Sequence, residues 1–457
     1  MRPILTPHEM RAVDAAAVAG GTAEHVLIER AAWAVARRAR RMLGGSYGRR
    51  VVVIAGPGNN GADGRVAARF LAERGTSVRV IDAAETPEQL PDCDLVIDAA
   101  YGTGFRGVWT APRTDVPVLA VDIPSGIDGM TGCAHGRPLR AMATVTFAAL
   151  KPGLLFGDGA EFAGDVEVVD IGLDVSSSRV FAVDADDVAV PPRATDAHKW
   201  KAAVLAVAGS PGMVGAASLA SEAALCAGAG IVHLVSPGAS SDGAIPREVV
   251  RRSVGSLAWA PDVVEMARSR FAAMVIGPGL GRERSTLADV RRVVAEATLP
   301  MVIDGDALFA LDGDLSVLAN RRGSTVITPH DGEFTQLTGS APSADRISSA
   351  RSLAADANCV CLLKGPATVI AAPDGRVAVV DEGDERLATA GSGDVLAGVT
   401  AAFIARGAPA FEAAYSAAFV HARAARRGRA VGLLAGDLPM AVADVLCEVD
   451  EVDEVDA

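Results

Sequence analysis

Short, continuous apolar runs recur along the sequence at intervals that leave room for a helix between them. The first series lies at residues 51–54, 78–81, 95–97, 116–121, 144–147 and 166–169. The second series lies at residues 204–207, 231–234, 274–276, 301–303, 326–327, 360–363 and 368–370. Runs that are apolar throughout are typical of strands covered on both faces. The sequence therefore predicts parallel sheets between layers of helices, an α/β fold.

Two adjacent prolines, Pro191 and Pro192, separate the two series and predict a linker at residues 188–196. The length of 457 residues also exceeds that of one ordinary core. We therefore expect two α/β domains, at residues 1–188 and 194–457. An Ala-rich helical stretch at residues 7–42 opens the first domain, and long Ala-rich helices follow Asp394 in the second.

The composition excludes several classes of protein. A net charge of −13 argues against nucleic acid as the main partner, although backbone N–H groups can still bind a nucleotide. We find no apolar signal core and no charge-free run long enough to span a membrane, so we expect no membrane partner and a cytoplasmic location. The six cysteines are scattered and only Cys359 and Cys361 are close, which favours buried thiols of a reducing cytosol over ligands of a shared metal.

A glycine-bearing turn at residues 55–64 directly follows the first apolar run and leads into a helical segment. A strand, a glycine turn and a helix in this order form a phosphate cradle at the carboxyl edge of a parallel sheet. Asn59 and Asn60 occupy the turn, so it differs from the G-x-G-x-x-G dinucleotide fingerprint. The sequence therefore predicts an anion site here of a different kind.

Polar residues also end the next strands of the first domain. Asp98 follows one run, and Asp122 and Ser125 follow another. The carboxyl ends of parallel strands meet at one edge, so these residues and Asn60 are expected to converge. Such a set, rich in oxygen and without His or Cys, suits a hard cation. The alternative is that these residues only cap strand ends and form Asx-turns.

The second domain repeats the arrangement of strand ends, with a glycine turn at residues 208–217 and a second one at residues 391–394. Lys364 can neutralise a phosphate, and backbone N–H groups of the second turn can bind a transferring group. Asp394 can take a proton from a hydroxyl that is about to be phosphorylated. The alternatives are that Ser392 or Asp394 merely caps a helix, and that His330 is a satisfied core histidine.

Residues 58–64 together with residues 121–126 resemble the NAD(P)H-hydrate epimerase domain, over about residues 6–173. The resemblance implies a Rossmann-like three-layer sandwich, a potassium ion held by Asn60, Asp98 and Ser125, and Asp122 as the catalytic acid/base. It also implies contacts between the damaged nucleotide and Asn59, Asn60, Gly61, Ala62, Asp63, Gly102, Thr103, Gly104, Phe105, Arg106, Gly107, Val108 and Asp122. The family usually has glycine at the position of Ala62.

Residues 328–333 and 387–398 resemble the ribokinase-like family and, within it, the nucleotide-dependent NAD(P)H-hydrate dehydratase, over about residues 198–445. The resemblance implies that the hydrate contacts Ala217, Gly279, His330 and the catalytic Asp394. It implies a nucleotide site formed by Lys364, Gly365, Pro366, Ala367, Thr368, Ala390, Gly391, Ser392 and Gly393. Trp200 and its neighbours replace glycines that the family commonly carries after a His-Lys pair.

Both resemblances together predict an enzyme that repairs hydrated nicotinamide cofactors, NADHX and NADPHX. The first domain would interconvert the R and S epimers, and the second would dehydrate the S epimer with ADP, giving AMP and phosphate. ATP remains an alternative donor, Mg²⁺ is expected with the nucleotide, and a homo-oligomer is expected. One rival function is a small-alcohol or vitamin kinase with an accessory domain. The other is a catalytically silent first domain that serves protein interaction or oligomer assembly.

Overall fold

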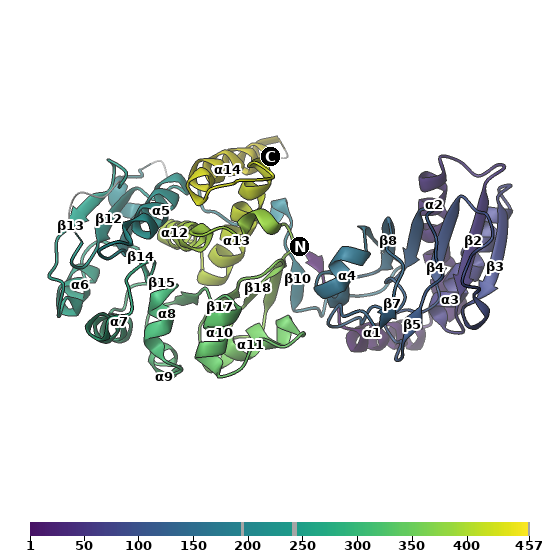
Figure 1. The fold of residues 1–457 in the computed structure, drawn as a ribbon, viewed down its shortest axis with the longest axis horizontal. Helices are drawn as coiled ribbons and strands as arrows, with labels where there is room; N and C mark the ends of the chain where they lie inside the picture. The colour runs from purple at the N-terminus through teal and green to yellow at the C-terminus, as the bar shows by residue number, and fades with distance from the viewer. Residues whose placement is uncertain (193–195, 240–244, 456–457) are drawn as a thin grey trace. The chain divides into compact units, whose positions relative to one another are not determined.

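The computed structural model describes residues 1–192, 196–239 and 245–455, with the backbone alone from residue 450 on. The chain divides between Phe181 and Ala182 into two compact units, with Met1 counted in the second (Figure 1). Residues 193–195 of the predicted linker lie outside the described residues. The bounds 1–188 and 194–457 for the two functional domains stay predictions.

The N-terminal unit contains a parallel sheet with the strand order β3-β2-β4-β6-β8-β9. Its strands are β2 (Arg50–Ala55), β3 (Ser77–Asp82), β4 (Leu95–Ala99), β6 (Val118–Val121), β8 (Ala143–Phe147) and β9 (Asp165–Val169). Each coincides with a predicted apolar run, and β2, β4, β6 and β8 are almost wholly buried, as strands covered on both faces must be. The predicted parallel sheet is therefore confirmed for this unit.

Two helices of the N-terminal unit precede the first strand of this sheet in the chain, and two lie between its strands (Figure 1). They are α1 (Pro7–Ala19), α2 (Glu24–Leu43), α3 (Asn59–Ala72) and α4 (Gly157–Phe162). The short strands are β1 (Arg2–Pro3), β5 (Trp109–Thr110) and β7 (Gly136–Arg137). The predicted single helical stretch at residues 7–42 is wrong in one respect, because Gly20 ends α1 and Gly21 adopts φ +97°, a conformation that a helix cannot contain.

The strand order of the N-terminal sheet reverses at β2, which has β3 on one side and β4 on the other. The segments that leave the carboxyl ends of β2 and β4 therefore diverge and leave a crevice between them. Asn59 and Asn60 begin the helix after β2, and Gly102 lies in the segment after β4. The topology alone thus brings these predicted residues to one place.

The C-terminal unit contains a larger sheet, with the order β19-β18-β17-β16-β15-β14-β11-β12-β13 among its described strands. These are β11 (Ala203–Val207), β12 (Ile231–Val235), β13 (Val250–Arg252), β14 (Ala273–Ile276), β15 (Met301–Ile303), β16 (Thr325–Ile327), β17 (Val360–Leu363), β18 (Thr368–Ala371) and β19 (Val377–Val380). β10 (Val180–Ala182) crosses the division between the units. β18 pairs antiparallel with both β17 and β19, and the pairs from β17 to β13 are parallel. The order reverses at β11, between β12 and β14.

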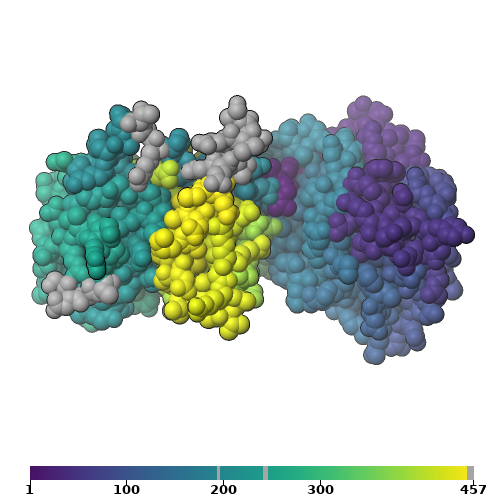
Figure 2. Space-filling view, turned by 90° about the horizontal axis from the view of Figure 1, so that it is seen from above, coloured from purple at the N-terminus to yellow at the C-terminus, as the bar shows by residue number. Residues whose placement is uncertain are grey.

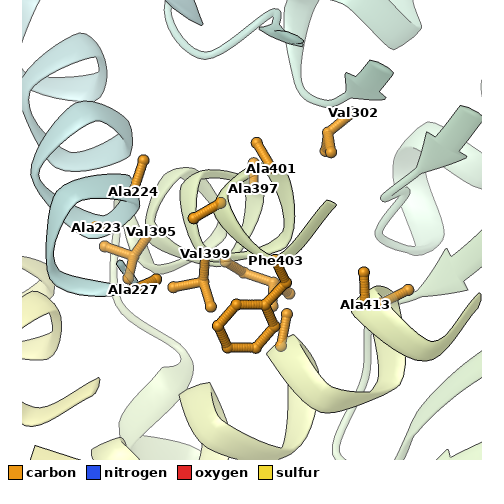
Figure 3. Packing of buried hydrophobic residues seen from close by; sticks show 14 of the residues in the cluster. Ala223, Ala224, Ala227, Val302, Val395, Ala397, Val399, Ala401, Phe403 and Ala413 are labelled. Carbon is orange, nitrogen blue, oxygen red and sulfur yellow. The ribbon is translucent and has the colours of Figure 1, made fainter. Parts of the chain in front are cut away.

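One helix of the C-terminal unit, α12 (Ser392–Ala405), is buried along its whole length from Val395 to Ala405. Figure 3 shows Val395 beside alanines of α5 (Val214–Cys226), with Ala413 of α13 (Ala410–Arg427) across α12. A helix without a polar face needs cover on every side. The remaining helices are α6 (Ala260–Ala267), α7 (Arg284–Glu296), α8 (Asp306–Leu311), α9 (Ser316–Ala319), α10 (Asp331–Thr338), α11 (Arg346–Asp356) and α14 (Leu438–Val455).

Helix α14 is yellow in Figure 2 and lies on the surface of the C-terminal unit. In the described stretches of the chain, no helix combines the length and the apolar character needed to cross a bilayer. Cys359 and Cys361 are buried free thiols, as predicted. Burial raises the pKa of the Cys359 thiol to about 12, so this thiol is held in its neutral form.

Candidate functional site

The N-terminal unit contains a cavity of about 870 Å³ at the crevice beside β2 and β4. The predicted residues that line it are Asn59, Asn60, Asp63, Gly102, Thr103, Gly104, Phe105 and Asp122. The predicted residues outside its lining are Gly61, Ala62, Arg106, Gly107 and Val108. The Val108 side chain is 77% exposed, and the Arg106 guanidinium donates to the carbonyl oxygen of Phe105 at 2.8 Å. The cavity thus brings most of the first predicted set together.

The turn after β2 needs glycine where it approaches its own strand. A Cβ atom at Gly61 would lie 1.9 Å from the carbonyl oxygen of Gly56, so no larger residue fits there. Gly102 lies between two of the predicted side chains, because a Cβ atom there would be 3.5 Å from both Asn60 Cβ and Asp122 Oδ2. The segments after β2, β4 and β6 therefore meet at this point.

Asp98 and Ser125 form one hydrogen-bonded pair beneath the crevice. Ser125 donates from its Oγ to Asp98 Oδ1 at 2.6 Å and from its backbone N–H to Asp98 Oδ2 at 2.9 Å. Asp98 is fully buried, and burial raises the pKa of its carboxyl while the hydrogen bonds from Ser125 oppose that rise. Asp98 also accepts from the backbone N–H of Ala100 at 3.3 Å, so the strand-end alternative holds in part for this residue.

The polar atoms of the Asn60 side chain are unsatisfied. Both its amide oxygen and its amide nitrogen are buried and find no hydrogen-bond partner among the described residues. A buried amide oxygen without a donor is costly, and a cation would satisfy it. The oxygen atoms of Asn60, Asp98 and Ser125 therefore have the chemistry of a hard-cation site, although only Asp98 and Ser125 contact each other directly.

Lys151 is a site residue that the sequence analysis missed. It follows β8, its side chain is 2% exposed, and its Nζ lies 2.8 Å from Asp122 Oδ1. Asp122 itself adopts φ +66°, a left-handed conformation that is uncommon outside glycine and recurs at functional sites. The available signal was a single lysine in the apolar stretch of residues 147–155, which the pattern of the strands does not explain.

Two further carboxyls line the same cavity. Asp63, from the first turns of α3, is buried, and this burial, with the charges of Asp122 and Asp14, raises its pKa to about 8. Asp14 of α1 was not predicted, and burial raises the pKa of its carboxyl too. The cavity therefore favours one neutral carboxyl, Asp63, next to the ion pair of Asp122 and Lys151.

In the C-terminal unit, two glycine loops that leave β11 and β14 are joined by hydrogen bonds. Ser210 Oγ donates to the carbonyl oxygen of Gly279 at 2.9 Å, and the backbone N–H of Gly209 donates to that of Pro278 at 2.7 Å. Ala217 lies behind this junction, fully buried in α5. The predicted hydrate-binding residues Ala217 and Gly279 are thus neighbours at the point where the strand order reverses.

A buried lysine and several carboxyls lie at the next strand ends. Lys364 Nζ contacts Asp304 Oδ1 at 2.9 Å and Glu333 Oε2 at 3.5 Å, and Thr328 Oγ1 donates to Asp304 Oδ1 at 2.7 Å. A Cβ atom at Gly393 would lie 3.4 Å from Lys364 Nζ, so the predicted glycine turn lies directly over this group. Asp304 and Glu333 raise the pKa of the Lys364 ammonium, against the effect of burial, and keep it charged.

Asp394 lies in the first turn of α12 and titrates near neutral pH. Burial, followed by the charge of Asp304, raises the pKa of its carboxyl to about 7, although Lys364 acts in the opposite direction. The N-cap of α12 is Gly391, without a side-chain cap, and Ser392 Oγ donates to the carbonyl oxygen of Leu387 at 2.8 Å. The alternative that Ser392 or Asp394 merely caps the helix is therefore wrong.

His330 is not a satisfied core histidine, because 60% of its side chain is exposed. Its Nδ1 accepts from the backbone N–H groups of Gly332 and Glu333 and so caps α10.

The remaining predicted nucleotide-binding residues differ in exposure: Gly365, Pro366 and Ala390 are exposed, Thr368 and Gly391 are half-buried, and Ala367 is buried. Trp200 precedes β11 and packs against His233 of β12 and against Phe271, with ring centroids 5.3 and 6.1 Å apart.

Comparison with known proteins identifies a family for each of the two domains. Residues 204–446 match the family described as NAD(P)H-hydrate dehydratase, and residues 24–93 and 81–153 match the family described as YjeF-related protein N-terminus. A solved ribokinase-like superfamily protein from Enterococcus faecalis covers 60% of this chain and 96% of its own, with a TM-score of 0.50 and 21% identity. This likeness confirms the ribokinase-like fold of the C-terminal domain.

Relatives also match along nearly the whole chain. The bifunctional NAD(P)H-hydrate repair enzyme Nnr of Mycobacterium leprae is 37% identical over 440 residues, which cover 88% of this chain and 89% of that protein. The enzyme of the same name from Moorella thermoacetica is 34% identical and covers 90% of both chains. The two recognised domains therefore occur in the same order and extent in these relatives. The chain belongs to the family of bifunctional NAD(P)H-hydrate repair enzymes.

Proposed function

We propose that this chain repairs hydrated NADH and NADPH in two steps, one in each domain. The first domain interconverts the R and S hydrates, and the second removes water from the S hydrate at the expense of ADP. The single observation that carries the proposal is that each unit places a half-buried carboxyl near a lysine that follows a strand of its sheet: Asp122 with Lys151, and Asp394 near Lys364.

In the first step, Asp122 acts as the acid/base. Its Oδ2 lies next to Gly102 at the cavity wall, where the backbone can approach a ligand closely. The aromatic ring of Phe105 lines the same cavity and stacks on Tyr101, with centroids 4.2 Å apart. A planar, partly apolar wall of this kind suits a nicotinamide ring next to a carboxylate that accepts and returns its proton.

A potassium ion bound by Asn60, Asp98 and Ser125 would support this step. The unpartnered amide oxygen of Asn60 and the buried carboxylate of Asp98 supply the oxygen ligands that such an ion needs. When bound, the ion supplies positive charge next to the phosphate cradle after β2 and fixes the position of Asn60. The remaining chemistry belongs to the side chains of the cavity.

In the second step, Asp394 takes the proton from the ring hydroxyl of the S hydrate as that oxygen attacks the terminal phosphorus of ADP. The P–O bond to AMP breaks, and AMP leaves. The ring carbon that bears the phosphorylated oxygen then loses phosphate, which is a far better leaving group than hydroxide. The neighbouring ring carbon gives up a proton to solvent, and the ring regains its double bond. Lys364 and the N–H groups of the Gly391–Gly393 turn stabilise the transferring group. Mg²⁺ would accompany the nucleotide near Asp304 and Glu333, which supply carboxylate oxygens.

The decisive experiment incubates mixed NADHX epimers with ADP or with ATP and follows the formation of NADH. Full conversion of both epimers supports the proposal, and the better nucleotide identifies the natural donor. Accumulation of a stable phosphorylated product would instead favour a small-alcohol or vitamin kinase. Conversion of the S epimer alone, with no response to potassium, would favour a silent first domain. A homo-oligomeric state and a cytoplasmic location stay predictions from the sequence.

A further inference from the structure

A buried lysine that the proposed mechanism does not need as a reactant lies behind the first site. Lys151 Nζ donates to Thr146 Oγ1 at 2.7 Å, to the carbonyl oxygens of Phe147 and Ala149 at 2.9 and 3.1 Å, and lies 2.8 Å from Asp122 Oδ1. Lysine is almost never fully buried unless its charge is paired. These contacts therefore fix the position of the Lys151 ammonium at the base of the cavity.

The contacts of Lys151 divide the two oxygen atoms of Asp122. Oδ1 is held by Lys151 and also accepts from Thr146 Oγ1 at 3.1 Å. Oδ2 lies on the other side of the carboxyl, beside Gly102 and the cavity. Only Oδ2 is thus presented to a ligand, and its direction is fixed by what binds Oδ1.

The surroundings of Asp122 would otherwise oppose its negative charge. The acidic residues Asp14, Asp63 and Glu24 line the same cavity. The basic residues that line it are Arg11 and Lys151. Burial first, and the charge of Asp122 in addition, raise the pKa of both Asp14 and Asp63. The ammonium of Lys151 lies at hydrogen-bond distance and is the cation that pairs with Asp122.

We propose that Lys151 is a positioning residue of the epimerase site, which holds Asp122 by its Oδ1 and directs its Oδ2 into the cavity. This inference rests on the proposed role of Asp122 as the acid/base. A buried ion pair alone is a poor source of stability, since desolvation offsets most of the attraction. A functional reason for retaining the pair is therefore needed, and control of Asp122 supplies one.

The test measures conversion of R-NADHX to the S epimer by the full-length enzyme without nucleotide, as a function of pH. In Lys151→Met we expect kcat to fall about 100-fold at pH 7, with KM changed less than about threefold, because positioning acts on the reacting group rather than on binding. The acid limb of the pH profile should also move up by about one pH unit or more.

Lys151→Arg keeps the charge but changes its geometry, so kcat should fall about tenfold while the acid limb stays in place. Arg140→Met, which removes an exposed cation of the same unit, is the matched control and should match the wild type.

The double variant Asp122→Asn/Lys151→Met separates this inference from its premise. If Lys151 acts through Asp122, the second substitution should add less than about a twofold loss to the first. An Asp122→Asn enzyme that epimerises normally would refute the role of Asp122 and with it this inference. An inactive Asp122→Asn beside a Lys151→Met enzyme with wild-type kcat and pH profile would overturn the role of Lys151 alone. Should the Met variant fail to fold, Lys151→Arg decides: unchanged kcat would overturn the proposal.

Discussion

The two sites of this chain use the same residue types in opposite electrostatic arrangements. In the N-terminal unit the buried lysine, Lys151, binds the proposed acid/base Asp122 directly. In the C-terminal unit Lys364 is bound to Asp304 and Glu333, and Asp394 is left with a pKa of about 7. The first carboxyl is thus bound by an ammonium, whereas the second is balanced between its two forms. The difference suits a group that only moves protons and one that must be quenched after it has activated a hydroxyl.

The largest expected effect comes from removing the proton acceptor of the second site. Asp394→Asn should lower the rate of NADH formation from S-NADHX and ADP by about 10³-fold or more, because the attacking hydroxyl loses its base. Stopped-time assays of NADH absorbance measure this loss. Epimerisation in the same protein serves as the control and should be unaffected. Near-normal turnover would show that Asp394 is not the base.

The matching change in the first site should spare the second. Asp122→Ala is expected to reduce consumption of the R epimer by about 10²- to 10³-fold and to leave repair of the S epimer intact. Separation of the two epimers by chromatography during the reaction measures both rates in one sample. Equal rates on R and S would contradict the assignment and remove the contrast between the sites.

The pH profile of dehydration should report on Asp394 without any substitution. The pKa of Asp394 is raised to about 7, so its carboxyl is protonated and inactive as a base below that pH. We expect kcat/KM for dehydration to fall about tenfold per pH unit below 7 and to level off above it. A rate that stays constant below pH 7 would contradict the role of Asp394 as the base of the second site.

The smallest effect concerns stability. Between about pH 4 and 8 the native state retains the proton of Asp63, whose pKa is raised to about 8, whereas the unfolded chain has released it. The free energy of unfolding should therefore fall as pH rises through this window, by up to about 1.4 kcal/mol per pH unit. Asp63→Asn removes the titration, so its stability relative to the wild type should increase from pH 5 to pH 8.

Amide hydrogen exchange of strands β2 and β4 reports this change for the N-terminal unit. Asp115→Asn, an exposed carboxyl of the same unit, is the matched control and should show no such trend. An Asp63→Asn enzyme whose advantage does not grow with pH would mean that Asp63 is ionised in the native state. Asp63 would then no longer contrast, as a neutral carboxyl, with Asp122 and its ion pair in the same cavity.

The apolar runs predicted most strands of both sheets, because burial on both faces leaves a local record in the sequence, but β13 and β19 had no predicted run. Candidate site residues were predictable in glycine turns and at strand ends, as for Asn60, Asp98 and Asp394. Lys151 and Asp14 were missed, since their burial depends on segments that meet only in the folded chain. The alternative of a core histidine at His330 was wrong for a similar reason: the exposure of a lone imidazole cannot be read from its neighbours.

Helix α12 places Asp394 at the end of a block in which no residue from Val395 to Ala405 faces solvent. An amphipathic helix such as α2 tolerates exchange at its exposed positions, so its mutational record should show a rhythm of about 3.6 residues. For α12 we expect amino-acid substitutions to be poorly tolerated at every position from Asp394 to Ala405. Evolution can therefore tune the dehydratase through the loops around this carboxyl, but hardly through the helix that carries it.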